Sequence, residues 1–187
     1  RRSSQSTRQA MKDDEVSNIA STHLKKVTML LEILDVSSKK PYFDTSFELL
    51  NLIFTILDDL ETLGKDGKLP ILYTQETIAS CLKNIIERLK DMNVVVKNPS
   101  AIRADVIVSA IRASDSPQVQ NKLLLVIAAL ASLSPELVLH SVMPIFTFMG
   151  AHTIRQDDEF SGHVVEQTII CVVPALANAA QYGKIDE

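Results

Sequence analysis

The stretch SAIRASDSPQVQNKLLLVIAALA, residues 109–131, predicts the end of one helix, a short turn and the start of a second helix. Ser116 and Pro117 mark the start, because a small polar N-cap followed by proline at the first helical position is a common helix beginning. The apolar residues that follow recur at spacings of four and three, which places them on one face of a helix. They are Val119, Leu123, Val126, Leu130 and Leu133.

The same period recurs along most of the chain. It predicts helices with apolar faces at Leu24, Val27, Leu31 and Leu34, then at Phe47, Leu50, Phe54, Leu57 and Leu60, and then at Ile78, Leu82, Ile85 and Leu89. A short helix that ends at Ala113 is marked by Ile102, Val106 and Ala110, with the neighbouring Ile107 and Ile111. Another should start at Ser134-Pro135-Glu136 and end at Gly150, and the last should run from about Glu159 to Ala180. Its predicted inner face comprises Val165, Ile169, Val172, Leu176 and Ala179. We therefore expect an all-α chain of about seven helices.

Local signals suggest where these helices begin and end. Asp44 or Thr45 is a candidate N-cap for the second helix, and Thr74 with Thr77 is the candidate start of the third. The sequence between Gly64 and Gly67 predicts a turn. Pro174 should kink the last helix, since an interior proline removes a backbone hydrogen bond. The β-branched run at 94–96 suggests an extended piece, but no second strand is predicted to pair with it.

Residues 1–15 have no apolar periodicity and almost no large apolar side chain, which suggests a mobile N-terminal arm before a helical-repeat domain at 16–187. Residues 1–12 contain four basic and no acidic side chains, so the remainder has 15 basic against 23 acidic groups, a net charge of -8. Such an acidic body is a poor generic binder of phosphate backbones. Salt-sensitive, sequence-independent RNA contact is instead a hypothesis for Arg1, Arg2, Arg8 and Lys12.

Two isolated cysteines, Cys81 and Cys171, fit buried free thiols in a reducing compartment, with a disulfide or a reactive thiol as the alternative. The longest apolar run, residues 123–131, is much shorter than the roughly 20 residues of a membrane span. We expect a non-membrane internal segment of a longer protein.

No catalytic motif is found in the sequence, and we expect neither an enzyme nor a bound cofactor or metal. His23, His140, His152 and His163 match no metal-ligand spacing. The polar cluster Arg155, Gln156, Asp157 and Asp158, followed by Glu159, is interpreted as an inter-helix turn or a partner contact. Acidic groups there would interact favourably with a helix N-terminus. Arg155 could instead ion-pair with these acids or bind a partner's carboxylate or phosphate.

The helical order leaves two architectures open, a bundle or a stack of helical hairpins. Recurrent short-helix, turn and longer-helix units favour the stack, as does the repetition of VMPIF and VVPAL. Residues 109–131 also resemble a HEAT or armadillo-type repeat, in which an Asp caps the second helix and a valine opens its apolar face. Such repeats usually place Lys or Arg after that valine, whereas this chain has Gln120. The resemblance implies an α-solenoid of degenerate helical hairpins.

A sharper resemblance lies in MPIFTFMG (143–150), RQDDEFS (155–161) and VPAL (173–176). These strings resemble the large HEAT-repeat scaffold of the UtpA (t-UTP) subcomplex of the small-subunit processome. The resemblance implies a nucleolar, non-catalytic scaffold in ribosome biogenesis. It implies association with other UtpA proteins and with the 5′ external transcribed spacer of pre-rRNA, pre-18S rRNA processing, and a link to RNA polymerase I transcription. The alternative hypothesis is an adaptor-type helical-repeat module that binds protein cargo in transport or trafficking.

Overall fold

The protein is described by a computed structural model covering residues 2–64, 69–153, 166, 168–170, 172–174, 176–177 and 180–181. Its α-helices are α1 (Arg2–Ser38), α2 (Phe47–Gly64), α3 (Leu72–Asp91), α4 (Ala104–Ala113), α5 (Pro117–Leu133) and α6 (Val142–Thr153). Three short 3-10 helices are η1 (Pro99–Ala101), η2 (Pro135–Leu137) and η3 (Leu139–Ser141). The described residues between 166 and 181 are also helical, and no described residue lies in a strand. The prediction of an all-α chain with about seven helices is confirmed for this part of the chain.

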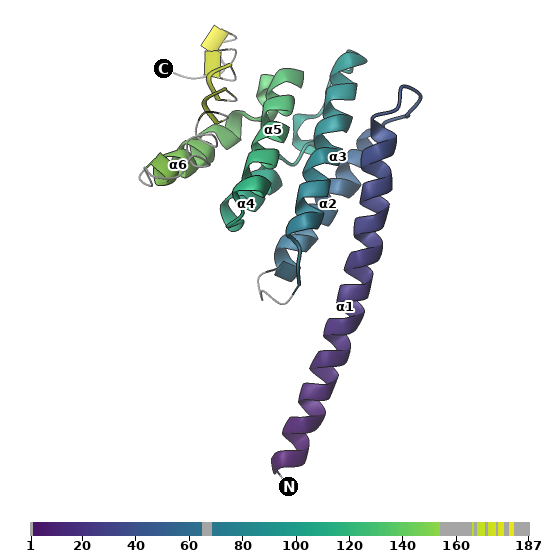
Figure 1. The fold of residues 1–187 in the computed structure, drawn as a ribbon. Helices are drawn as coiled ribbons and strands as arrows, with labels where there is room; N and C mark the ends of the chain where they lie inside the picture. Colours follow the sequence, from purple (N-terminus) through teal and green to yellow (C-terminus); the bar gives the residue numbers. More distant parts are fainter. Residues whose placement is uncertain are drawn as a thin grey trace.

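The helices lie in two rows. Figure 1 shows α1, α3 and α5 side by side, with α2 and α4 in a second row behind them. Helix α3 packs against both α1 and α5, while α2 contacts α3 and α4, and α4 contacts α5. The pairs α2–α3 and α4–α5 are therefore two consecutive helical hairpins. The N-terminal part of α1 projects beyond the two rows (Figure 1).

Polar contacts show that equivalent helices of the two hairpins run parallel. In the first row, Glu76 near the start of α3 pairs with Lys122 of α5, and Lys90 near the end of α3 donates to Ser132. In the second row, Asp58 of α2 pairs with Arg103 just before α4, and the later Glu61 accepts from Ser109 of α4. The second hairpin therefore repeats the first in the same orientation.

Apolar periodicity explains the core between the rows. All four predicted contact residues of α3 are buried: Ile78, Leu82, Ile85 and Leu89. In α2 the predicted residues Leu50, Phe54, Leu57 and Leu60 are buried, together with Ile53. Phe47 and Leu133 are only partly buried and pack at the edge of the core. Each fully buried aliphatic or aromatic side chain contributes about 1.5–3 kcal/mol through the hydrophobic effect.

Two predicted helix starts are wrong. Helix α2 begins after Ser46, whose hydroxyl accepts a hydrogen bond from the Leu49 N–H at 3.2 Å, so neither Asp44 nor Thr45 is the N-cap. Helix α3 begins at Leu72, and Thr74 and Thr77 are buried inside it. The Thr74 hydroxyl lies 2.8 Å from that of Thr28 in α1. The side chain that the local pattern assigned to a helix cap therefore makes a contact between two helices instead.

The single helix predicted from Ser134 to Gly150 is also wrong. Residues 135–141 form η2 and η3, and α6 begins only at Val142 and extends past Gly150 to Thr153. The reason is Pro144, which would remove a hydrogen bond and clash with the preceding turn if it lay inside a longer helix. A start at Val142 places Pro144 in the first turn of α6, where backbone N–H groups have no partner within the helix.

The two ends of the chain carry further predictions. Residues 2–15 are part of α1, and the mobility of the N-terminal arm at 1–15 stays a prediction. Near the C-terminus Val172 is buried as predicted, whereas Ile169 is 45% exposed and does not belong to an inner face. Val165, Ala179 and the turn residue Gly67 lie outside the described residues, and the kink at Pro174 stays a prediction.

Candidate interaction groove

The turn between α4 and α5 orients the elements around the groove. The Ser116 hydroxyl accepts a hydrogen bond from the Val119 N–H at 3.4 Å, and Pro117 occupies the first position of α5. The Ser114 hydroxyl accepts from the Ser116 N–H at 3.2 Å, which tightens the turn. The helix start predicted at Ser116 and Pro117 is confirmed, whereas Asp115, the Asp of the HEAT-type pattern, is exposed and is not the cap.

Gln120 joins the two helices below this turn. Its side chain is buried, and its Nε2 donates to the Ser114 carbonyl at 2.7 Å and to the Ile111 carbonyl at 3.4 Å. Carbonyls in the last turn of a helix have no partner within the helix, so Gln120 caps the C-terminus of α4. A neutral amide does this without the desolvation cost of burying a charged Lys or Arg. The departure from the repeat pattern therefore marks a buried polar contact.

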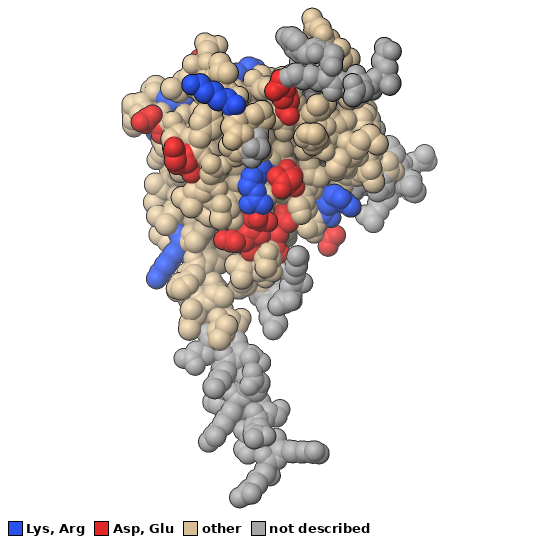
Figure 2. Space-filling model, turned by 180° about the vertical axis from the view of Figure 1, so that it is seen from behind, with Lys and Arg blue, Asp and Glu red and all other residues tan. Residues whose placement is uncertain are grey.

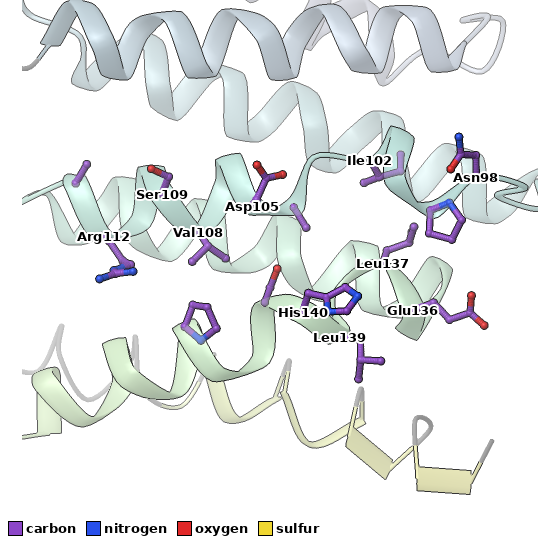
Figure 3. A pocket seen from close by; sticks show the side chains of 15 residues that line it. Asn98, Ile102, Asp105, Val108, Ser109, Arg112, Glu136, Leu137, Leu139 and His140 are labelled. Atoms are coloured by element: carbon purple, nitrogen blue, oxygen red, sulfur yellow. The ribbon is translucent and has the colours of Figure 1, made fainter. Parts of the chain in front are cut away.

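An open groove of about 1180 Å³ lies beside α4. One wall is the face of α4 that carries Val108 and Arg112, and the opposite wall is the η2–η3 segment with Leu137, Leu139 and His140 (Figure 3). The break of the predicted 134–150 helix creates this second wall. Sequence periodicity missed the groove for that reason, and Pro144, which also lines it, was the available signal.

The chemistry of the groove combines an apolar base with a charged rim. Val108 and Leu137 are buried, whereas Arg112, His140 and Asp105 are exposed. Apolar centres with polar rims are typical of protein–protein contacts. In the part of the chain that the structure describes, no three His, Cys, Asp or Glu side chains are grouped as metal ligands. The apolar base and charged rim of the groove are suited to docking a polypeptide segment.

A charged contact crosses from α2 to α4 next to the groove. Arg103 lies 2.9 Å from Asp58 of α2 and 3.9 Å from Asp105 of α4, and Ser109 donates to Glu61 at 2.9 Å. Figure 2 shows acidic and basic side chains gathered on this face of the molecule. Exposed ion pairs of this type contribute about 0.2–1 kcal/mol each. These contacts join α2 to the start and middle of α4.

Several candidate site residues fall outside these contacts. Arg155, Gln156, Asp157 and Asp158 lie outside the described residues, as does Arg1. The other basic candidates belong to the first turns of α1, at Arg2, Arg8 and Lys12. Partner or RNA contact at these positions stays a prediction.

Cys81 is a buried free thiol, as the sequence predicts. Its Sγ donates to the Leu31 carbonyl at 3.3 Å, linking α3 to α1. Burial, reinforced by the nearby negative charge of Asp35, raises the pKa of the Cys81 thiol to about 12. The thiol is therefore protonated at neutral pH and is a poor nucleophile. Cys171 lies outside the described residues.

No helix in the described ranges has the length and apolar character needed to span a bilayer.

Comparison with known proteins identifies the family. No family model matches the chain. U3 small nucleolar RNA-associated protein 10 of Candida albicans is 61% identical over 179 residues, which is 95% of this chain and 10% of the relative. The chain belongs to the U3 small nucleolar RNA-associated protein 10 family. The Kluyveromyces lactis member is 58% identical over 188 residues, covering 100% of the chain, and the Debaryomyces hansenii member is 58% identical over 181 residues, covering 95%.

The family expected from residues 143–176 is thus confirmed by similarity along nearly the whole chain. The chain spans only about a tenth of the length of these members of the U3 small nucleolar RNA-associated protein 10 family.

Proposed function

We propose that this chain is a non-catalytic scaffold segment that supports assembly of the small-subunit processome in ribosome biogenesis. The observation that carries the proposal is the 61% identity to a relative named for its association with U3 small nucleolar RNA. Through that assembly the segment supports pre-18S rRNA processing and the linked transcription by RNA polymerase I. Its proposed location is the nucleolus.

The proposed architecture is an α-solenoid of degenerate HEAT- or armadillo-like hairpins. Support comes from the two helical hairpins, because α4–α5 has the same orientation as α2–α3. The Glu76–Lys122 and Asp58–Arg103 pairs join equivalent helices of the two hairpins. In a solenoid each repeat contacts its neighbours and leaves extended surfaces free for partners. Such surfaces suit a scaffold, because many partners can bind along one polypeptide.

The proposed partners are other UtpA proteins and the 5′ external transcribed spacer of pre-rRNA, contacted directly or through the complex. The groove beside α4 is the proposed protein-docking surface on this segment, because Val108 and Leu137 lie below a rim with Arg112 and His140. Direct RNA contact by the N-terminal basic residues remains a separate prediction. The alternative of a transport adaptor has no support from the relatives compared, whose names refer to U3 small nucleolar RNA.

The experiment is affinity purification of the full-length protein from its own cells, with sequencing of bound RNA and mass spectrometry of bound proteins. We expect U3 RNA, small-subunit rRNA precursors and UtpA proteins to co-purify. Recovery of transport receptors and their cargo without those RNAs would refute the proposal.

A paired substitution tests the segment itself. Arg112→Glu with His140→Glu adds negative charge at two exposed positions on the rim of the groove without touching a buried side chain. We expect at least about a threefold loss of one or more protein partners, which corresponds to roughly 0.7 kcal/mol. Gln118→Glu, an exposed change on α5, is the matched control and should leave the bound proteins unchanged. Equal recovery with both variants would exclude the groove as the docking surface.

A further inference from the structure

Helix α1 packs on α3 through one well-defined face. Leu24 and Leu31 are buried there, and the Leu31 carbonyl accepts from Cys81. Successive contacts then follow both helices in the same direction, because Thr28 meets Thr74 at 2.8 Å and the later Asp35 accepts from Asn84 at 3.0 Å. Helix α1 therefore stands next to α3 in the same parallel relation that α3 has to α5.

The opposite side of α1 is apolar and uncovered. Met29, Leu30, Ile33 and Val36 are 59–67% exposed. Met29, Ile33 and Val36 are spaced by four and three residues, so they share a face. At 100° per residue, Ile33 lies about 160° around the helix from the buried Leu31. We call these four residues the outer face of α1.

The outer face gives α1 the pattern of an interior helix rather than of an end helix. A surface helix buries one apolar stripe and presents polar residues on the other side, whereas a helix apolar on opposite sides is buried on both. End repeats of solenoids need a polar outer surface for solubility. Val16 and Ile19, also exposed, continue the apolar character toward the projecting part of α1.

We propose that the outer face of α1 is the docking site for an α-helix of the same polypeptide, namely the first-row helix that comes before α1 in the full-length protein. This inference rests on the solenoid architecture proposed above. In the first row, spatial order follows chain order from α1 to α3 to α5, so the next position beyond α1 belongs to preceding chain. The relatives are long enough to contain such chain, since this segment spans only 10% of their length.

The chemistry of the occupant follows from the outer face and its border. Its contact side must be apolar, because Met29, Leu30, Ile33 and Val36 offer no charged group. The exposed Lys25 and Lys26 lie one turn before Met29 and Leu30, so acidic residues bordering the apolar stripe of the occupant would complement them. We therefore expect an amphipathic helix with acidic flanks that lies parallel to α1.

Cysteine accessibility in the full-length protein tests the proposal. Ile33→Cys places a thiol at the centre of the outer face, and Gln118→Cys, at an exposed position of α5 that the proposed contact does not involve, is the control. Maleimide labelling at each position is followed by peptide mass spectrometry in native and urea-unfolded protein. We expect native labelling of the Ile33→Cys thiol to be at least about tenfold slower than unfolded labelling, which corresponds to about 1.4 kcal/mol. Labelling of the control should change less than about threefold.

A parallel measurement on the 187-residue chain identifies the occupant. In that chain the Ile33→Cys thiol should label as rapidly as the control at every protein concentration. Protection that appears only at high concentration would assign the outer face to a second copy and overturn the proposal. Rapid labelling in purified full-length protein, with protection only inside the assembled complex, would assign it to another protein and also overturn it. Neither readout depends on RNA recovery, so failure here is distinguishable from failure of the proposed scaffold function.

Discussion

Replacing Gln120 with Glu should convert a buried cap into a buried, pH-sensitive defect. The substitution keeps the shape of the side chain but replaces the Nε2 donor, which lies 2.7 Å from the Ser114 carbonyl and 3.4 Å from that of Ile111, with an acceptor oxygen. At neutral pH a carboxylate would face two carbonyl oxygens inside the protein. Desolvation and the loss of donors both disfavour its charged form, so the pKa of the introduced Glu rises above its usual value.

The sign of the pH dependence follows from proton binding. An unfolded Glu has a pKa of about 4.3, and each unit by which the folded value exceeds it corresponds to about 1.4 kcal/mol of lost stability at higher pH. A shift of about two units would reduce the free energy of unfolding by roughly 2–3 kcal/mol near neutral pH. Between the two pKa values the folded state binds more protons than the unfolded state. The loss relative to the parent chain should therefore shrink as pH falls toward about 4.

Urea unfolding followed by far-UV circular dichroism measures this effect for parent and variant at several pH values. Near neutral pH the expected loss corresponds to a fall in Tm of about 4–12 °C for a chain of this size. Gln118→Glu is the control, because Gln118 is exposed in the first turn of α5, where a negative charge is favourable. An unchanged stability of Gln120→Glu near neutral pH, or a deficit that does not shrink on acidification, would refute the role of Gln120 as a buried donor.

Three further outcomes test other parts of the fold. Gly150→Ala should stabilise the protein by about 0.5–1 kcal/mol in thermal melts, because Gly150 lies inside α6 and an added Cβ meets nothing within 4 Å. Gly64→Ala should give no such stabilisation, because its added Cβ would overlap the Ile71 side chain. Ser116→Ala should cost about 1 kcal/mol in urea unfolding, and a loss below about 0.3 kcal/mol would argue against the cap. The Cys81 thiol should react with maleimide at least about 100-fold more slowly in native than in unfolded protein near pH 8. Because the folded pKa of Cys81 is raised, the contribution of the protonated thiol to the free energy of unfolding should be fully present below about pH 9. That contribution should be lost as the pH rises from about 9 to the folded pKa of about 12, which alkaline unfolding would measure.

The sequence by itself determined the helical class, most of the buried faces and the family. Periods of three and four residues identify the inner sides of α2, α3 and α5, because burial of one helix face imposes that spacing on apolar residues. Ser116 with Pro117 marks a helix start reliably, since both act within one turn of backbone. The strings MPIFTFMG and RQDDEFS pointed to the family without any catalytic chemistry.

Only the tertiary structure decided which polar side chains act locally and which act across helices. Thr74 is of a residue type that often caps helices but hydrogen-bonds to Thr28 in another helix, and Gln120 departs from the repeat pattern and is buried against the end of α4. The groove beside α4 exists because Pro144 is accommodated by a late start of α6. The sequence likewise did not reveal the exposed outer face of α1, because apolar periodicity does not distinguish a covered apolar stripe from an uncovered one. Each of these features depends on neighbours distant in sequence, and a local pattern carries no record of them.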